Sequence, residues 1–257
     1  MADNFLIPDW PAPAQVKSAI TLRSGGCSRA PFDSNNLALH VEDSEADVQT
    51  NRQNLIKSLA LPTHPLWLNQ CHGTDLVYVP DYLHEPQQAA TADGSYSDTA
   101  NSVCAILTAD CLPVLLCNQS GTQVAAAHAG WRGLCGGILR KTVATFKHSP
   151  GQVMAYLGPA IGPQVFEVGG EVLQAFLSRA QNQSHQLAIR KAFNAVDGSE
   201  GKYLADLYAL ARAELSASGV TDIYGGNCCS YSDSEHFYSF RREPKTGRNA
   251  SLIWLQS

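Results

Sequence analysis

Three short apolar runs follow one another in the middle of the chain and dominate its hydrophobic pattern. They occupy residues 103–107, 114–117 and 124–127, and each is too short for a helix and is bounded by turn-forming residues. Their apolarity is continuous rather than alternating, which is typical of strands covered on both faces. Residues 118–121, Asn-Gln-Ser-Gly, favour a hairpin between the second and third runs. We therefore expect a buried sheet at the centre of the molecule.

The flanking segments carry helical spacing or further short apolar runs. Ser44 and the acidic residues after it resemble a capping box, and the helix they open places Val48, Leu55 and Leu59 on one face. Further helices are expected at residues 136–146, 171–179 and 204–217. Further strands are expected at residues 18–22, 66–68, 76–79, 153–157, 223–224 and 252–255. Two polar segments are expected to form a surface loop and a mobile connection, at residues 84–101 and 181–200.

Length and composition limit the class of protein. The 257 residues show no internal repeat and no linker-like change, so we expect one domain spanning residues 1–257, with an α+β fold and a large mixed sheet. A net charge of -5, with no basic run longer than two residues, argues against nucleic acid or an anionic membrane as partner. The N-terminus does not resemble a signal peptide, and no stretch reaches the roughly 18 apolar residues of a membrane span. These features predict a cytoplasmic protein.

The eight cysteines do not indicate a disulfide framework. Most of them lie inside apolar runs, where a free cysteine behaves as a small buried hydrophobic residue. No C-x-x-C pair is present, so neither a zinc ribbon nor a thioredoxin-like site is indicated. We expect the cysteines to be reduced.

Cysteine and histidine residues stand where these apolar runs meet turns. His72 lies in the bend Gln70-Cys-His-Gly73, Cys111 separates two of the central runs, and His128 ends the third. One thiolate and two imidazoles suit zinc, and three protein ligands leave a fourth position for water or substrate. The residue types and their placement therefore predict a zinc site, although their wide separation matches no local metal-binding motif.

Two other interpretations of the same residues stay open. Cys111 is also compatible with a buried core cysteine, with backbone carbonyls satisfying both histidines. A Cys–His pair in which an imidazole lowers the thiol pKa is a second functional interpretation, as a nucleophile. Chelation separates these readings, because it removes zinc from a metal site but leaves a thiol nucleophile intact.

Arginines close to these positions are candidates for substrate contacts. Arg132 follows His128 and Trp131, and a guanidinium suits bidentate contact with phosphate or carboxylate, while the tryptophan suits stacking on a planar group. A surface arginine and a core tryptophan are the plainer alternative. A second basic cluster, for which a solvated turn is the plainer reading, comprises Arg241, Arg242 and Arg248.

Two carboxylates stand in otherwise apolar sequence, Asp110 and Glu167. A carboxylate is costly to bury unpaired. Each is therefore a candidate to orient a ligand histidine or to act as a general base, with a turn or cap contact as the alternative.

Several ordered motifs indicate a known family. They are Gln70-Cys-His-Gly73, Thr108-Ala-Asp-Cys111, His128-Ala-Gly-Trp-Arg-Gly133, Gly158-Pro-Ala-Ile-Gly-Pro163 with Phe166-Glu-Val-Gly169, and Phe240-Arg-Arg242 with Thr246-Gly-Arg248. Together they resemble the YfiH family, also called the polyphenol oxidase or laccase-domain family and the peptidoglycan editing factor family. Arg23-Ser-Gly-Gly26 is similar to the opening segment of that family, so the resemblance covers essentially the whole chain.

The resemblance implies a layered α/β/β/α-like fold and one zinc ion held by His72, Cys111 and His128. It also implies phosphorolysis of adenosine, inosine, guanosine and methylthioadenosine, and deamination of adenosine. A nucleoside and phosphate would then be the partners, and the oligomeric state is left open. On this reading Cys111, His128 and Asp110 are the candidate catalytic residues. The candidates for substrate binding are Arg23, Arg132, Arg241 and Arg248.

Two alternative functions stay open, and a third is disfavoured by the histidine pattern of the sequence. Bacterial members are linked to removing misincorporated serine from a UDP-muropeptide precursor, which makes a hydrolase the alternative enzyme. A partner-binding module with purely structural zinc is the non-enzyme alternative. The eight histidines include no His-x-His pair, which disfavours copper and multicopper laccase chemistry. Cys71 stands where the family usually has Val, and an inward-packing role is expected for it.

Overall fold

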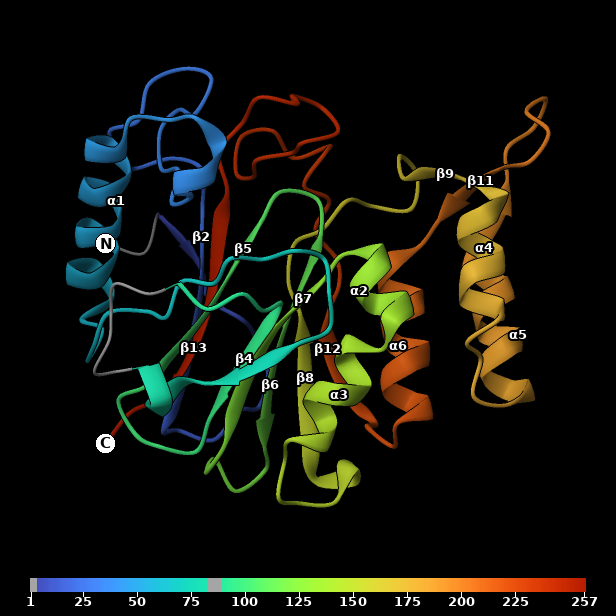
Figure 1. Ribbon diagram of the computed structural model, residues 1–257, viewed down its shortest axis with the longest axis horizontal. Coiled ribbons are helices and arrows are strands. Elements are labelled where there is room, and N and C mark those ends of the chain that lie inside the picture. Colours follow the sequence, from blue (N-terminus) through green and yellow to red (C-terminus); the bar gives the residue numbers. More distant parts are fainter. Residues whose placement is uncertain (1–3, 83–88) are drawn as a thin grey trace.

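Two β-sheets lie face to face at the centre of the molecule, and helices cover their outer faces (Figure 1). The computed structural model describes residues 4–82 and 89–257. One outer face is covered by α1 (Glu45–Leu59), and the other by α2 (Trp131–Gly136), α3 (Ile138–Ala144) and α6 (Leu207–Ala217). The expected α+β fold with α/β/β/α layers is therefore confirmed. No helix within the described ranges has both the length and the apolarity to cross a membrane.

The sheet under α1 has four strands, and all its pairings are antiparallel. Its strands, in spatial order, are β1 (Phe5–Leu6), β2 (Val16–Thr21), β13 (Asn249–Leu255) and β5 (Val103–Thr108). Side chains alternate across a strand, so in β5 Ala105 and Leu107 pack with Leu55 of α1, whereas Cys104 and Ile106 pack between the two sheets. This double burial explains the continuous apolarity of the β5 sequence.

The second sheet has six strands and is mixed. In spatial order they are β12 (Asp222–Gly225), β8 (Val153–Leu157), β6 (Leu112–Asn118), β7 (Val124–Ala129), β4 (Gly94–Ser97) and β3 (Leu76–Tyr78). The outermost pair on each side is parallel and the inner pairs are antiparallel. In β7, Ala125 and Ala127 face the helices, whereas Val124 and Ala126 face the other sheet. His128 continues the second set, so its side chain starts on the side between the sheets.

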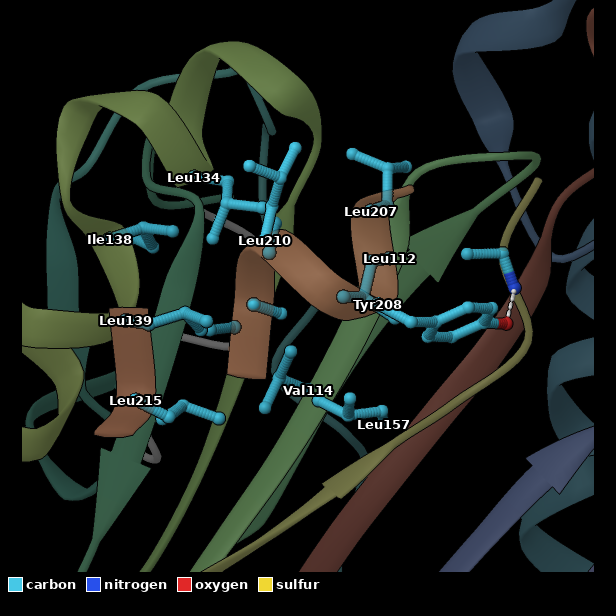
Figure 2. Close-up of a cluster of buried hydrophobic side chains, with 14 of the residues drawn as sticks. Leu112, Val114, Leu134, Ile138, Leu139, Leu157, Leu207, Tyr208, Leu210 and Leu215 are labelled. Atoms are coloured by element: carbon cyan, nitrogen blue, oxygen red, sulfur yellow. Dashed lines mark hydrogen bonds between the residues drawn. The ribbon is translucent and has the colours of Figure 1, made fainter. Parts of the chain in front are cut away.

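The helix-covered face of this sheet carries the largest core cluster (Figure 2). Leu112 and Val114 of β6 are fully buried there, together with residues of three helices, among them Leu134, Leu139 and Leu215. Tyr208 of α6 reaches out of the apolar cluster, and its hydroxyl accepts a 2.8 Å hydrogen bond from the backbone N–H of Ala160. That bond ties α6 to the loop after β8.

A small antiparallel sheet and two helices lie beyond α6 (Figure 1). They are β9 (Glu167–Gly169), α4 (Gly170–Leu177), α5 (Gln183–Lys191), β10 (Phe193–Ala195) and β11 (Lys202–Ala205), with β11 as the central strand. Among the described residues there are also three single-turn 3₁₀ segments, η1 (Leu39–Val41), η2 (Val79–Tyr82) and η3 (Pro150–Gln152).

Several expected elements differ from the observed ones. In place of the single helix expected at 136–146, the chain forms α2, which begins at Trp131, and α3. The two are separated at Gly137, where φ is +90° and the backbone is left-handed. No strand forms at 66–68, where Leu66 makes only an isolated bridge to Cys104. The helix after Ser44 is confirmed, and the Ser44 side chain accepts a hydrogen bond from the Asp47 N–H.

Regular structure is present in the described parts of both polar segments. Residues 83–88 lie outside the described ranges, but Asp93 is fully buried, and β4 begins at the next residue, Gly94. A Cβ on Gly94 would lie 2.3 Å from Leu76 Cδ2, so the small residues of β4 permit close strand packing. The expected mobile connection at 181–200 contains α5 and β10, with Ile189 as a buried anchor.

Candidate metal centre

Three segments from different parts of the chain bring His72, Cys111 and His128 together. One ligand atom from each residue lies within 4.8 Å of the ligand atoms of the other two, and the two imidazole centroids are 4.9 Å apart. His128 is buried at the end of β7, Cys111 is half-buried and His72 is exposed. The cluster is therefore anchored at its base and open on the side of His72. It is the only group of three or more potential metal ligands within residues 4–82 and 89–257.

The turn that carries Cys111 connects the two central sheets. β5 belongs to the four-stranded sheet and β6 to the six-stranded sheet, so the chain must reverse and change layers within three residues. Asp110 takes a left-handed φ of +82°, a conformation that aspartate tolerates better than most residues. Cys111 is thereby placed at the mouth of the gap between the sheets.

Two glycines allow the other segments to come close to this turn. A Cβ on Gly130 would lie 2.8 Å from Cys111 Sγ, and a Cβ on Gly133 would lie 2.8 Å from the carbonyl oxygen of Gly73. Larger residues would push the cluster apart. The glycines that flank Trp131 and Arg132 therefore have a steric role next to the candidate ligands.

Asp93 is the residue that organises the site and that sequence reasoning missed. Its side chain is fully buried, and its Oδ1 accepts hydrogen bonds from His128 Nδ1 at 2.8 Å and from the His72 N–H at 2.9 Å. Its Oδ2 accepts from the N–H groups of Gly73 at 2.6 Å and Cys71 at 3.2 Å. One carboxylate thus fixes both the imidazole of His128 and the bend that carries His72. In the sequence, Asp93 stands in the polar segment 84–101, for which a surface loop was expected.

These contacts also keep Asp93 ionised. Burial alone would raise its pKa, but the hydrogen bonds from His128, the Gly73 backbone and the Cys71 thiol lower the pKa well below its usual range. An ionised carboxylate only accepts hydrogen bonds, so Nδ1 of His128 must carry the proton. Nε2 of His128 is then the ring nitrogen that is free to bind a metal.

The thiol of Cys111 and the imidazole of His128 stabilise each other's charged forms. Burial opposes the Cys111 thiolate, but His128 and His72 outweigh burial and lower the pKa of Cys111 to about 6. Burial likewise lowers the pKa of His128, whereas Cys111 and Asp93 raise it to about 9. The metal-free site therefore favours a thiolate and an imidazolium at neutral pH. A bound divalent cation would replace the proton on His128 as the positive charge that compensates the Cys111 thiolate.

Asp110 and Glu167, the carboxylates expected near the ligands, do not contact the histidines. Asp110 accepts hydrogen bonds from the Ser230 hydroxyl at 2.7 Å and from the Arg241 N–H at 2.6 Å. It therefore ties the C-terminal segment to the Cys111 turn. Glu167 lies on β9, about half exposed, and faces Lys202 at 3.7 Å. The expectation that Glu167 lies in apolar surroundings was wrong. The carboxylate that orients His128 is that of Asp93.

The candidate arginines differ in whether their guanidinium groups already have protein partners. The Arg23 guanidinium is already shared between Asp33 at 3.7 Å and Glu243 at 3.8 Å. The Arg241 guanidinium donates a 3.2 Å hydrogen bond to the Glu167 carbonyl. These two arginines have protein partners for their guanidinium groups.

Arg132 and Arg248 are better placed to receive an anion. Arg132 is exposed, lies 4.4 Å over the Trp131 ring, and has no acidic partner among the described residues. Arg248 Nη1 donates to the Thr246 and Gly247 carbonyls at 2.8 and 3.0 Å, which leaves its other donors available. Burial lowers the pKa of Arg248, while the charges of Cys111 and Asp110 raise it, so its guanidinium lies within their electrostatic reach.

Comparison with known proteins agrees with this architecture. A family model described as multi-copper polyphenol oxidoreductase laccase matches residues 17–256. The chain is 48% identical over 252 residues to purine nucleoside phosphorylase YfiH of Escherichia coli K12, covering 98% of this chain and 99% of that protein. It is also 48% identical over 252 residues to purine nucleoside phosphorylase PA4543 of Pseudomonas aeruginosa, covering 98% of both.

Solved structures give the same result. The Neisseria meningitidis protein NMB0706 is 47% identical and superimposes with a TM-score of 0.92, covering 99% of this chain and 100% of that chain. YlmD from Geobacillus stearothermophilus is 30% identical with a TM-score of 0.89, covering 100% of this chain and 98% of that chain. The sequence and structural matches both extend over nearly the full length, and the chain therefore belongs to the YfiH family of multi-copper polyphenol oxidoreductase laccase proteins.

Proposed function

We propose that this protein is a zinc-dependent purine nucleoside phosphorylase. Relatives that are 48% identical over nearly the full length carry the name purine nucleoside phosphorylase. The observation that carries the metal part of the proposal is the bond from His128 Nδ1 to the buried Asp93 carboxylate. A carboxylate behind an imidazole is the usual support of a metal-ligating histidine, because it fixes the tautomer and the ring orientation.

The donor set of the site fits zinc better than several copper ions. One thiolate and two imidazoles form a three-ligand set that leaves a position open, as in catalytic zinc sites. Bound zinc would supply a Lewis acid and lower the pKa of coordinated water. A multicopper oxidase needs several metal centres, whereas the described residues assemble one group of ligands. His72, Cys111 and His128 are therefore proposed as ligands of one zinc ion.

Phosphorolysis requires the chain to hold phosphate beside the ribose. A phosphate oxygen forms a bond to C1′ while the C1′–N9 bond breaks, and the base leaves with the bonding electrons and gains a proton. We assign the phosphate to Arg132 and Arg248, whose free donors suit its oxygens. Asp110 acts as a positioning residue, since it holds the Arg241 backbone against the Cys111 turn.

Deamination of adenosine is the second activity proposed for the same site. It replaces the 6-amino group by an oxygen from water and releases ammonia, so it needs no phosphate. The open position left by the three ligands is what supports it. The two reactions differ in product, because phosphorolysis of adenosine gives adenine and deamination gives inosine.

Incubation of the zinc-loaded protein with adenosine, with and without phosphate, tests both activities. We expect adenine and ribose 1-phosphate only with phosphate, and inosine in either case. Cys111→Ser should lose bound zinc and both products. Cys27→Ser alters an exposed thiol that contacts Asp47 and Asn51, away from the cluster, and should behave as the parent protein. Absence of adenine and inosine from the zinc-loaded parent would overturn the proposal.

A further inference from the structure

Phe240 is an unusually exposed aromatic side chain. Its exposed fraction is 52%, and in the described part of the chain it is the only aromatic residue among the large apolar side chains exposed to solvent. The others are Ile7, Leu39 and Leu187. An aromatic ring kept in water forgoes the stabilisation that burial provides, and its exposed area is available for contact with a ligand.

The backbone of Phe240 is held at the candidate metal centre. The peptide nitrogen that follows Phe240 belongs to Arg241, and its N–H donates to Asp110 Oδ2 at 2.6 Å. Asp110 directly precedes the ligand Cys111 and is held on its other oxygen by the Ser230 hydroxyl. The position of Phe240 is thereby fixed relative to the Cys111 turn.

The guanidinium of Arg248 lies over the Phe240 ring. The Arg248 guanidinium carbon is 5.9 Å from the centroid of the Phe240 ring. The charges of Cys111 and Asp110 act on the Arg248 guanidinium, so this arginine lies within electrostatic reach of the Cys111 turn. The Thr246 and Gly247 carbonyls hold Arg248 in this place. An aromatic ring and a guanidinium with free donors are therefore neighbours, on a segment that is hydrogen-bonded to the Cys111 turn.

Phe240 and Arg248 match the two chemically different groups that phosphorolysis brings together, a purine base and phosphate. A purine is a flat aromatic group, and aromatic side chains bind such bases by stacking without requiring particular hydrogen bonds. A guanidinium next to the stacked base would meet phosphate close to the ribose. Among the described residues, neither Ile7, Leu39 nor Leu187 combines an aromatic face with such a neighbour.

We propose that Phe240 is the stacking platform for the purine base and that it sets the affinity for the nucleoside. This inference rests on the proposed nucleoside phosphorylase function and names the residue that recognises the base. Stacking depends on the flat ring and not on particular substituents, so such a platform would accept different purine bases. Arg248 then contributes to phosphate binding and Phe240 to nucleoside binding.

Steady-state kinetics of Phe240→Ala tests the proposal. We expect the KM for inosine to rise roughly 5- to 150-fold, the range that follows from loss of one stacking contact. The kcat, the KM for phosphate and the zinc content should stay near the parent values. Phe240→Trp should retain a KM close to that of the parent, because it keeps a flat aromatic face. Leu187→Ala, another exposed apolar residue, is the matched control.

Equilibrium binding of inosine separates failure of this inference from failure of the proposed function. If the parent protein neither binds nor cleaves inosine, the proposed function fails. If the parent cleaves inosine and Phe240→Ala keeps its KM and its inosine affinity, only the platform role is wrong. Equal losses in Phe240→Ala and Phe240→Trp would also overturn stacking, since the second variant retains the aromatic ring. A change of sedimentation behaviour in Phe240→Ala with unchanged inosine binding would assign the ring to self-association instead.

Discussion

The buried carboxylate of Asp93 and the imidazole of His128 form a 2.8 Å hydrogen bond at the base of the candidate metal centre. The two residues come from neighbouring strands, because Asp93 immediately precedes β4 and His128 lies in β7, which pairs with β4. The His128 N–H also donates to the Asp93 carbonyl at 2.7 Å. Strand pairing thus places the carboxylate behind the ring, and the orientation of His128 is a direct consequence of sheet register.

Replacing Asp93 by Asn should weaken metal binding without removing a ligand. The amide keeps one accepting oxygen but cannot serve His128 and three backbone N–H groups as the carboxylate does. We expect zinc affinity to fall roughly 10- to 100-fold, the usual effect of removing a residue that supports a metal ligand. Competition with a chromophoric chelator measures this. Asp98→Asn, a carboxylate at the far end of β4 that contacts Tyr78 and Lys147, should leave the affinity unchanged.

Arg248→Ala should change phosphate use more than nucleoside use. Hydrogen bonds to a charged group contribute about 1.5–3 kcal/mol, so the KM for phosphate is expected to rise about 10- to 100-fold. Initial rates at varied phosphate and saturating inosine measure this effect. Arg23→Ala provides the contrast, because Arg23 already pairs with Asp33 and Glu243 and should affect stability rather than phosphate binding. A larger effect from Arg23→Ala on the phosphate KM would reverse the assignment.

The central strands and the candidate metal ligands could be predicted one segment at a time, because the signal for each is local. Residues that alternate between two buried faces must all be apolar, and the runs in β5, β6 and β7 show this directly. His72, Cys111 and His128 could be singled out by residue type and by resemblance to a family, and the structure brings them together. The local sequence could not show that they meet, because their contact depends on how two sheets stack.

Asp93 and β4 show what the sequence could not reveal. Gly94-Ser-Tyr-Ser97 is polar and small, which is typical of a loop, yet a Cβ on Gly94 would lie 2.3 Å from Leu76 Cδ2 and would force that side chain to move. Asp93 has no distinguishing neighbours in the chain, since all its partners come from other segments. For α5, the buried face consists of little more than His185 and Ile189, too narrow a stripe to predict a helix.

Tyr208→Phe should destabilise the protein because the hydrogen bonds of the Tyr208 hydroxyl are lost. Its hydroxyl accepts from the Ala160 N–H at 2.8 Å, a buried contact, and donates to the Cys228 carbonyl, a partly buried one. The variant keeps the ring but leaves a buried N–H without a partner, which costs roughly 1–3 kcal/mol in free energy of unfolding. Urea denaturation measures this cost. Tyr203→Phe, whose hydroxyl has no partner among the described residues, should change it by much less.

Thiol labelling should report whether Cys111 is a metal ligand. Cys104 and Cys117 are fully buried, and burial raises the pKa of each to about 12, so both stay protonated and unreactive at pH 8 in the folded protein. Cys27 is exposed and should react with iodoacetamide under every native condition. Cys111, half-buried at the open site, should react after chelation and be protected by added zinc, because a coordinated thiolate is not available as a nucleophile.

Peptide mass spectrometry before and after zinc addition resolves the cysteines individually. The metal-ligand assignment predicts that protection of Cys111 disappears in His128→Ala, because two remaining ligands hold zinc weakly, whereas labelling of Cys27 stays constant. A Cys–His nucleophile without metal predicts equal labelling of Cys111 with and without zinc. The same measurement therefore distinguishes the two chemical roles that the sequence left open for Cys111, and it does so independently of any substrate.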